Sequence, residues 1–294
     1  MCVPDVMKKG CPPVARPGGP AILAGLAAGC IPLAWHAGGW GVPAMLLTIS
    51  AACAIGYVDD RRVMAGWFKP VALCAAALPL ILAGPYDTSL EFPLFGAVHI
   101  PVLYLGVILA VVSTTGNTVN SIDVMNGVAS GYVAMAAGAV CVVLAVLGRW
   151  DALAFGAVLL AASLAFYRYH RLPSRIFPGD SGALALGVTY GCLAIYGGVE
   201  VVAAVAMLPA IANSFFFLHS VRRIVEHRQI GRAAVVRDDS LRLGDSGDPG
   251  APVTLVRLIL RRGPMTEAQV VREIFRLGAF SSGLAVLTGL MMVS

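Results

Sequence analysis

Charged residues are scarce in this sequence. Only 13% of its 294 residues are Asp, Glu, Lys or Arg, whereas soluble domains carry about 25%. Hydrophobic residues make up 58% of the chain, and its mean hydropathy is +0.82. A water-soluble domain is therefore excluded, and the composition indicates an integral membrane protein. We expect the membrane, and no nucleic acid, among its partners.

Cysteine motifs are also lacking, as is the apolar core of a signal peptide in residues 1–19. The seven cysteines show no CxxC spacing and lie mostly inside apolar runs, so they are interpreted as small core residues and not as a disulfide framework or a zinc site. Residues 1–19 are polar and rich in Pro and Gly. Because this segment has no apolar centre, it does not resemble a signal peptide.

Apolar runs of about the length of a bilayer span recur through the rest of the chain. They predict an all-α fold, a polytopic membrane helical bundle of about nine transmembrane helices in a single domain, 1–294. The one long polar insert is 219–267. The runs are 20–36, 41–57, 70–84, 100–116, 128–147, 152–167, 182–198, 199–218 and 270–292.

The basic residues predict the orientation of these spans. If the spans alternate in direction, all but Arg149 of the 21 Lys and Arg residues fall on one face. The positive-inside rule makes that face cytoplasmic. Segments 1–19 and 219–267 are then cytoplasmic loops of a multi-pass protein, which would lie in the cell membrane of a prokaryote.

One polar stretch stands out between two apolar runs, GNTVNSIDVMNGVASG at 116–131. The spacing places Asn117, Asn120 and Asp123 on one face of a helix that is leaving the bilayer. Their amide and carboxylate oxygens can converge on a metal ion or a sugar. A capped helix end followed by a polar turn is an equally good interpretation of this stretch alone.

A pair of adjacent carboxylates ends the second apolar run in GYVDD, at Asp59 and Asp60. Neighbouring carboxylates repel each other unless a cation lies beside them, and a divalent metal ion would serve. For an isolated pair, a solvated helix end held by Arg61 and Arg62 is the better interpretation.

A third carboxylate precedes an apolar run in PSRIFPGDSGALALG, at Asp180. This position can present a carboxylate and free backbone N–H groups to a phosphate or a metal. Taken alone, the pattern fits an N-cap formed by Asp180 or Ser181 better.

The three stretches are more specific together than singly. Acidic and amide groups recur at predicted cytoplasmic helix ends, and VEHRQIGR adds His227, Arg228 and Arg232. Carboxylates suit a metal ion and arginines suit phosphate oxygens. The combination predicts a magnesium-dependent site for a diphosphate substrate.

GYVDD, NTVNSIDVMNG and PSRIFPGDSG, in this order, resemble the polyprenyl-phosphate N-acetylhexosamine-1-phosphate transferase family, of the glycosyltransferase 4 type. The resemblance covers nearly the whole chain. It is closest to the branch that loads GlcNAc-1-phosphate onto dolichyl phosphate, because Asn126 stands where bacterial members usually have Asp and EHRQIGR resembles that branch's loop.

The resemblance implies a reaction in which a polyprenyl or dolichyl phosphate attacks the β-phosphorus of a UDP-N-acetylhexosamine, with UDP-GlcNAc as the expected donor. UMP leaves, and Mg²⁺ (Mn²⁺ being an alternative) bridges the pyrophosphate in this first membrane step of glycan assembly. It implies catalytic roles for Asp59, Asp60 and Asp180, and metal binding by Asp180 and Asn120. The residues implied to bind substrate are Lys69, Asn117, Asp123, Asn126, His227 and Arg228.

Some features depart from the family pattern. Val124 replaces a glycine, Glu226 replaces a basic residue, and His170 stands near the position of an asparagine. Family members also carry one further helix ahead of the stretch that 5–19 resembles. Either the sequence starts internally or the chain has one span fewer.

Other functions remain open on the sequence alone. They are a secondary transporter, a non-catalytic membrane scaffold, and a transferase with another UDP-HexNAc donor or a bacterial-type undecaprenyl-phosphate acceptor. The sequence also leaves a homodimer open.

Overall fold

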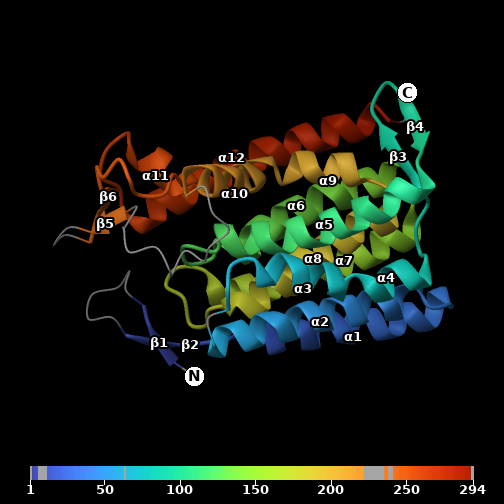
Figure 1. Ribbon diagram of the computed structural model, residues 1–294, viewed down its shortest axis with the longest axis horizontal. Helices are drawn as coiled ribbons and strands as arrows, with labels where there is room; N and C mark the ends of the chain where they lie inside the picture. Colours follow the sequence, from blue (N-terminus) through green and yellow to red (C-terminus); the bar gives the residue numbers. More distant parts are fainter. Residues whose placement is uncertain (1, 6–11, 63, 222–234, 238–240, 293–294) are drawn as a thin grey trace.

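The computed structural model describes residues 2–5, 12–62, 64–221, 235–237 and 241–292. Figure 1 shows long helices running side by side along the longest axis, with short strands at both ends. The helices are α1 (Gly19–Ala37), α2 (Gly41–Arg61), α3 (Phe68–Ala76), α4 (Leu78–Ala83), α5 (Pro101–Ile122), α6 (Val128–Val146), α7 (Trp150–His170), α8 (Gly179–Gly197), α9 (Glu200–Ala206), α10 (Leu208–Val221), α11 (Leu255–Leu260) and α12 (Glu267–Leu290).

Each expected apolar run coincides with helix, which confirms a mostly helical membrane protein. In the described part of the chain, five helices are long and apolar enough to cross a bilayer, namely α1, α2, α5, α6 and α7. A sixth span results if α9 and α10, which meet at 72°, are counted as one. The number of nine spans and the cytoplasmic position of the site stay predictions.

The strands form three antiparallel hairpins: β1 (Cys2–Pro4) with β2 (Pro13–Ala15), β3 (Ser89–Phe92) with β4 (Gly96–His99), and β5 (Val235–Arg237) with β6 (Leu243–Asp245). The first and third hairpins lie with α11 at one end of the bundle, and β3–β4 lies at the other (Figure 1). We call the end with β1–β2, β5–β6 and α11 the site end, and the end with β3–β4 the opposite end.

Helix α8 forms the centre of the bundle. All its residues except Tyr196 are buried, and it packs against α1, α2, α5, α6 and α7. A helix that is apolar on every side belongs in the core. Helix α2 lies very close to the start of α8, because a Cβ on Gly56 of α2 would lie 2.5 Å from the carbonyl carbon of Asp180. Only glycine allows this approach, which brings the end of α2 against the start of α8.

The hairpin β1–β2 is attached to the segment that leads into α8. Phe177 donates its backbone N–H to the Ala15 carbonyl at 2.9 Å, and Gly18 donates to the Phe177 carbonyl at 2.8 Å. Through these bonds, residues from the start of the chain lie beside Asp180.

Candidate active site

Asp60 holds the first turn of α8. Its carboxylate accepts the backbone N–H groups of Asp180 at 3.0 Å and Ser181 at 3.1 Å, and the Ser181 hydroxyl at 2.9 Å. The N-cap residue, Pro178, provides no side-chain cap. The expectation that Asp180 or Ser181 caps its own helix is therefore wrong. A carboxylate from α2 binds the free N–H groups instead and opposes the positive end of the helix dipole.

Lys69, near the start of α3, joins two of the predicted carboxylates. Its Nζ lies 2.9 Å from Asp59 Oδ2 and 2.7 Å from Asp180 Oδ2. Asp59 also accepts the Met64 backbone N–H at 2.7 Å. Lys69 is 1% exposed and Asp59 is fully buried. Buried charges of this kind need partners, and these residues provide them for one another.

Arg61 and Arg62 were expected to hold Asp59 and Asp60 at a solvated helix end if the pair was an isolated one. Both carboxylates are buried, so a solvated helix end is excluded. Arg61 instead lies over the ring of Tyr57, 4.7 Å from its centroid.

Arg16, from the segment between β2 and α1, completes the cluster. Its Nη2 donates to Asp60 Oδ1 at 2.8 Å and to Asp180 Oδ1 at 3.1 Å. Its side chain is 22% exposed, so it is the more accessible of the two cations. Sequence reasoning did not select Arg16. The available signal was a single basic residue in a Pro- and Gly-rich segment just ahead of the first apolar run.

The cluster of Arg16, Asp59, Asp60, Lys69 and Asp180 has more negative than positive groups. With three carboxylates and two cations ionised, its formal charge is −1. Counted over these described residues, the excess negative charge favours an additional cation.

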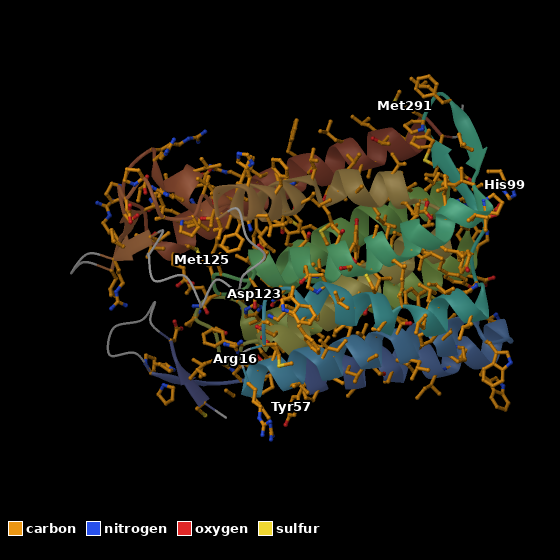
Figure 2. The ribbon with its side chains drawn as sticks, viewed as in Figure 1. Arg16, Tyr57, His99, Asp123, Met125 and Met291 are labelled. Atoms are coloured by element: carbon orange, nitrogen blue, oxygen red, sulfur yellow. The ribbon has the colours of Figure 1, made fainter. Side chains whose placement is uncertain are left out.

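A cavity of about 610 Å³ opens beside the cluster. Its wall includes five of the predicted residues and Arg16, whereas Asp59, Asp60 and Lys69 contact Asp180 from outside that wall. Figure 2 shows Arg16, Asp123 and Met125 at the site end, far from His99 and Met291. The five predicted residues in the wall are Asn117, Asn120, Asp123, Asn126 and Asp180.

Asp123 directly follows α5 on the cavity wall. Burial raises the pKa of its carboxyl to about 7, against the lowering effect of Arg16. His170 Nε2 lies 3.7 Å from Asp123 Oδ1, and His170 Nδ1 lies 2.9 Å from the Ser130 hydroxyl. The imidazole is thus held between α6 and the turn after α5. The sequence marked His170 only as a departure from a family pattern.

Asn126 lies where three segments meet. Its Nδ2 donates to Asp5 Oδ2 at 3.3 Å, and its backbone N–H donates to Glu267 Oε1 at 2.9 Å. All three residues are buried. An amide at 126 avoids placing another carboxylate against Asp5. Neither Asp5 nor Glu267 was predicted, because each is a single acidic residue outside the three stretches that predicted the site.

The structure therefore brings eight of the ten predicted site residues to one end of the bundle, in or behind one cavity wall. The other two, His227 and Arg228, lie outside the described residues.

Comparison with known proteins identifies the family. A family model described as glycosyl transferase family 4 matches residues 42–198, more than half of the chain. The chain belongs to this family. The match confirms the resemblance to polyprenyl-phosphate N-acetylhexosamine-1-phosphate transferases, whereas the dolichyl branch stays a prediction. Arg16, Asp5 and Glu267 lie outside the matched segment.

Two curated relatives are both named phospho-N-acetylmuramoyl-pentapeptide-transferase. The chain is 28% identical to the protein of Thermodesulfovibrio yellowstonii over 221 residues, which are 61% of each chain. It is 34% identical to the protein of Moorella thermoacetica over 126 residues, 42% of this chain and 38% of that one. The chain thus spans about three fifths or less of the length of these relatives.

Proposed function

We propose that the protein transfers N-acetylhexosamine-1-phosphate from a UDP-sugar to a polyprenyl phosphate and releases UMP. GlcNAc is the proposed sugar, and a dolichyl-type phosphate is the proposed acceptor. One observation carries the proposal: in a family 4 chain, Asp180 and Arg16 meet at the wall of a cavity lined by amide and acidic side chains, and buried Lys69 contacts Asp180 from behind that wall.

The cluster suits phosphoryl transfer, in which catalysis consists mainly of positioning and charge neutralisation. Arg16 lies on the cavity wall and can offer its guanidinium N–H groups to phosphate oxygens. Lys69, Asp59 and Asp60 are buried and contact Asp180. In this proposal, Asp180 touches the substrate and the three buried residues position it.

Asp180 and Asn120 would hold a magnesium ion. Among the described residues no three His, Cys, Asp or Glu side chains form a ready metal site. Magnesium nevertheless often takes only one or two protein carboxylates, with the rest of its oxygens coming from water and substrate phosphates. Hard oxygen donors at the cavity wall and the charge of −1 on the cluster both fit such an ion. Bound there, it would neutralise charge on the diphosphate, and Mn²⁺ would be an alternative.

The site end is proposed to face the cytoplasm. Among the helix ends that the structure describes, those near the cavity carry Arg61, Arg168 and Arg171, whereas the opposite end carries Arg149. The positive-inside rule supports this orientation. The position of the polar groups at helix ends, and not at mid-bundle, argues against a secondary transporter.

The names of the two relatives favour a second candidate, transfer of a phospho-N-acetylmuramoyl-pentapeptide. In this second candidate, the lipid acceptor would be undecaprenyl phosphate instead of a dolichyl-type phosphate. The two candidates share the reaction chemistry and differ in donor and acceptor.

The test is UMP release by the purified protein in detergent, with several UDP-HexNAc donors and UDP-MurNAc-pentapeptide, with and without a polyprenyl phosphate and Mg²⁺. We expect UMP only when lipid and metal are both present. Asp180→Asn and Asp59→Asn should abolish it, whereas Asp151→Asn, at the exposed start of α7, should not. No release with any donor would contradict the proposal and favour a scaffold.

A further inference from the structure

The N-terminal hairpin forms part of the cavity wall. Val3, Pro4 and Asp5 line the cavity together with Asn126 from the turn before α6. The hairpin is fixed in place, because Ala15 and Gly18 are hydrogen-bonded to Phe177 just ahead of α8. The hairpin precedes residues 42–198, which match the family model, and it lines the same cavity as Asp180.

Asp5 and Asn126 make a specific contact in this wall. Asp5 is 2% exposed and Asn126 is 3% exposed, so the bond from Asn126 Nδ2 to Asp5 Oδ2 is shielded from water. An ionised carboxylate only accepts hydrogen bonds. Asp5 therefore determines that the amino group of the Asn126 amide points toward the hairpin, and the carbonyl oxygen points away from it.

The position of the turn is fixed from a second side. The Asn126 backbone N–H donates to Glu267 at the first residue of α12. Backbone and side chain are each held by a carboxylate, so the Asn126 carbonyl oxygen is a pre-oriented acceptor. Such an acceptor suits a ligand N–H, which a UDP-N-acetylhexosamine offers at the uracil imide and at the acetamido group.

We propose that Asp5 is a positioning residue for donor binding, which holds the Asn126 amide in the orientation that accepts an N–H from the donor. This inference rests on the proposed function. It assigns to the N-terminal hairpin a part in the site that residues 42–198 do not supply.

The pairing can be exchanged between the two positions. Asn126→Asp alone places a carboxylate against Asp5 and near Glu267, and the repulsion should weaken donor binding. Exchanging the residues, as Asp5→Asn with Asn126→Asp, restores a donor on the hairpin and keeps an acceptor at position 126. The double variant should therefore bind donor better than Asn126→Asp.

The experiment compares the wild type, Asp5→Ala, Asp5→Asn, Asn126→Asp and the exchanged double variant. Steady-state kinetics with the UDP-sugar that the wild type uses gives KM and kcat, and calorimetry gives UDP affinity without turnover. Thermal unfolding in detergent reports on folding. Cys2→Ser, an exposed change in the same hairpin, is the matched control.

Asp5→Ala removes the acceptor that holds the Asn126 amide, so it should raise KM by about tenfold, with kcat within about threefold. The double variant should return KM to within about threefold of the wild type. If Asp5→Ala does not fold, Asp5→Asn and the double variant carry the test.

An unchanged KM in Asp5→Ala overturns the inference. So does a double variant no better than Asn126→Asp, or a loss of kcat that only follows a lower unfolding temperature. In each case turnover by the wild type would leave the proposed function standing. A wild type that neither releases UMP nor binds UDP would overturn both.

Discussion

The two ends of α8 both carry compensating charge, but they obtain it differently. At the site end, Asp60 accepts two backbone N–H groups and is itself bound by Arg16. At the opposite end, Arg149 donates to the carbonyls of Gly197 and Gly198 and pairs with Glu91 at 2.5 Å. An anion at the start of a helix and a cation at its end both oppose the helix dipole.

The difference lies in burial and connectivity. Arg149 and Glu91 have side chains about one third exposed, and their pair involves two segments. At the site end, four segments contribute charges that are mostly buried, and Asp180 at their centre faces a cavity. Compensation of a helix dipole stabilises a fold at either end. Both ends adjoin a cavity, because Glu91 and Arg149 line one of about 580 Å³. Burial and the cross-linking of several charges therefore distinguish the candidate active site from the opposite end.

The largest expected effect comes from removing Lys69. Lys69→Met leaves Asp59 and Asp180 buried without their shared cation, and breaking a buried pair in this way costs about 3–5 kcal/mol. Glu91→Met removes only the partly exposed pair with Arg149, for which about 1 kcal/mol or less is expected. Denaturant unfolding in detergent with EDTA measures both losses. Lys69→Arg, which keeps the charge, is the control. Equal losses for the two Met variants would contradict the comparison.

A smaller effect is expected from neutralising the carboxylates themselves. Asp60→Asn keeps one acceptor oxygen for the first turn of α8 but loses the ion pair with Arg16. We expect a loss of about 1–3 kcal/mol in stability and reduced UMP release. Glu200, buried near the opposite end, accepts a hydrogen bond from the Tyr104 hydroxyl.

The matched variant is Glu200→Gln, because glutamine can still accept from Tyr104. Its UMP release should equal that of the wild type, and its stability should change by less than about 1 kcal/mol. If Glu200→Gln lost turnover as Asp60→Asn does, function would not be confined to the site end. The two variants are measured in the same turnover and unfolding assays.

Much of this contrast could be predicted from sequence. Asp59, Asp60, Asp180 and the residues of 116–131 are conspicuous because polar groups at the ends of apolar runs need a reason. The apolar runs also located the helices. Two of these runs, 70–84 and 199–218, are each broken into two helices. Pro79 and Pro209 lie at the starts of the second helices, and proline favours that position.

The partners of these residues could not be predicted. Asp60 caps a helix 120 residues further along the chain, whereas capping rules consider only neighbouring residues. Arg16 is 164 residues from Asp180, and Asp5 is 121 residues from Asn126. Such contacts depend on how helices pack. The close approach at Gly56 and the attachment of the N-terminal hairpin follow from the folded structure and not from a local pattern.

The smallest expected effect concerns how the stability of the site end depends on pH. Burial raises the pKa of Asp123 from 3.8 to about 7 in the folded protein. Between these values the folded state binds the proton more tightly than the unfolded state, so this carboxyl lowers the stability of the wild type as pH rises from about 4 to about 7.

Asp123→Asn removes that titration. The variant should match the wild type in stability at about pH 3.5, where the carboxyl is mostly protonated in both the folded and the unfolded state. At pH 8 it should be more stable by about 1 kcal/mol, an amount below the full shift because the side chain is 15% exposed. Denaturant unfolding at the two pH values, without divalent metal, gives the difference. A gain of the same size at both pH values would mean that the carboxylate is not strained by burial.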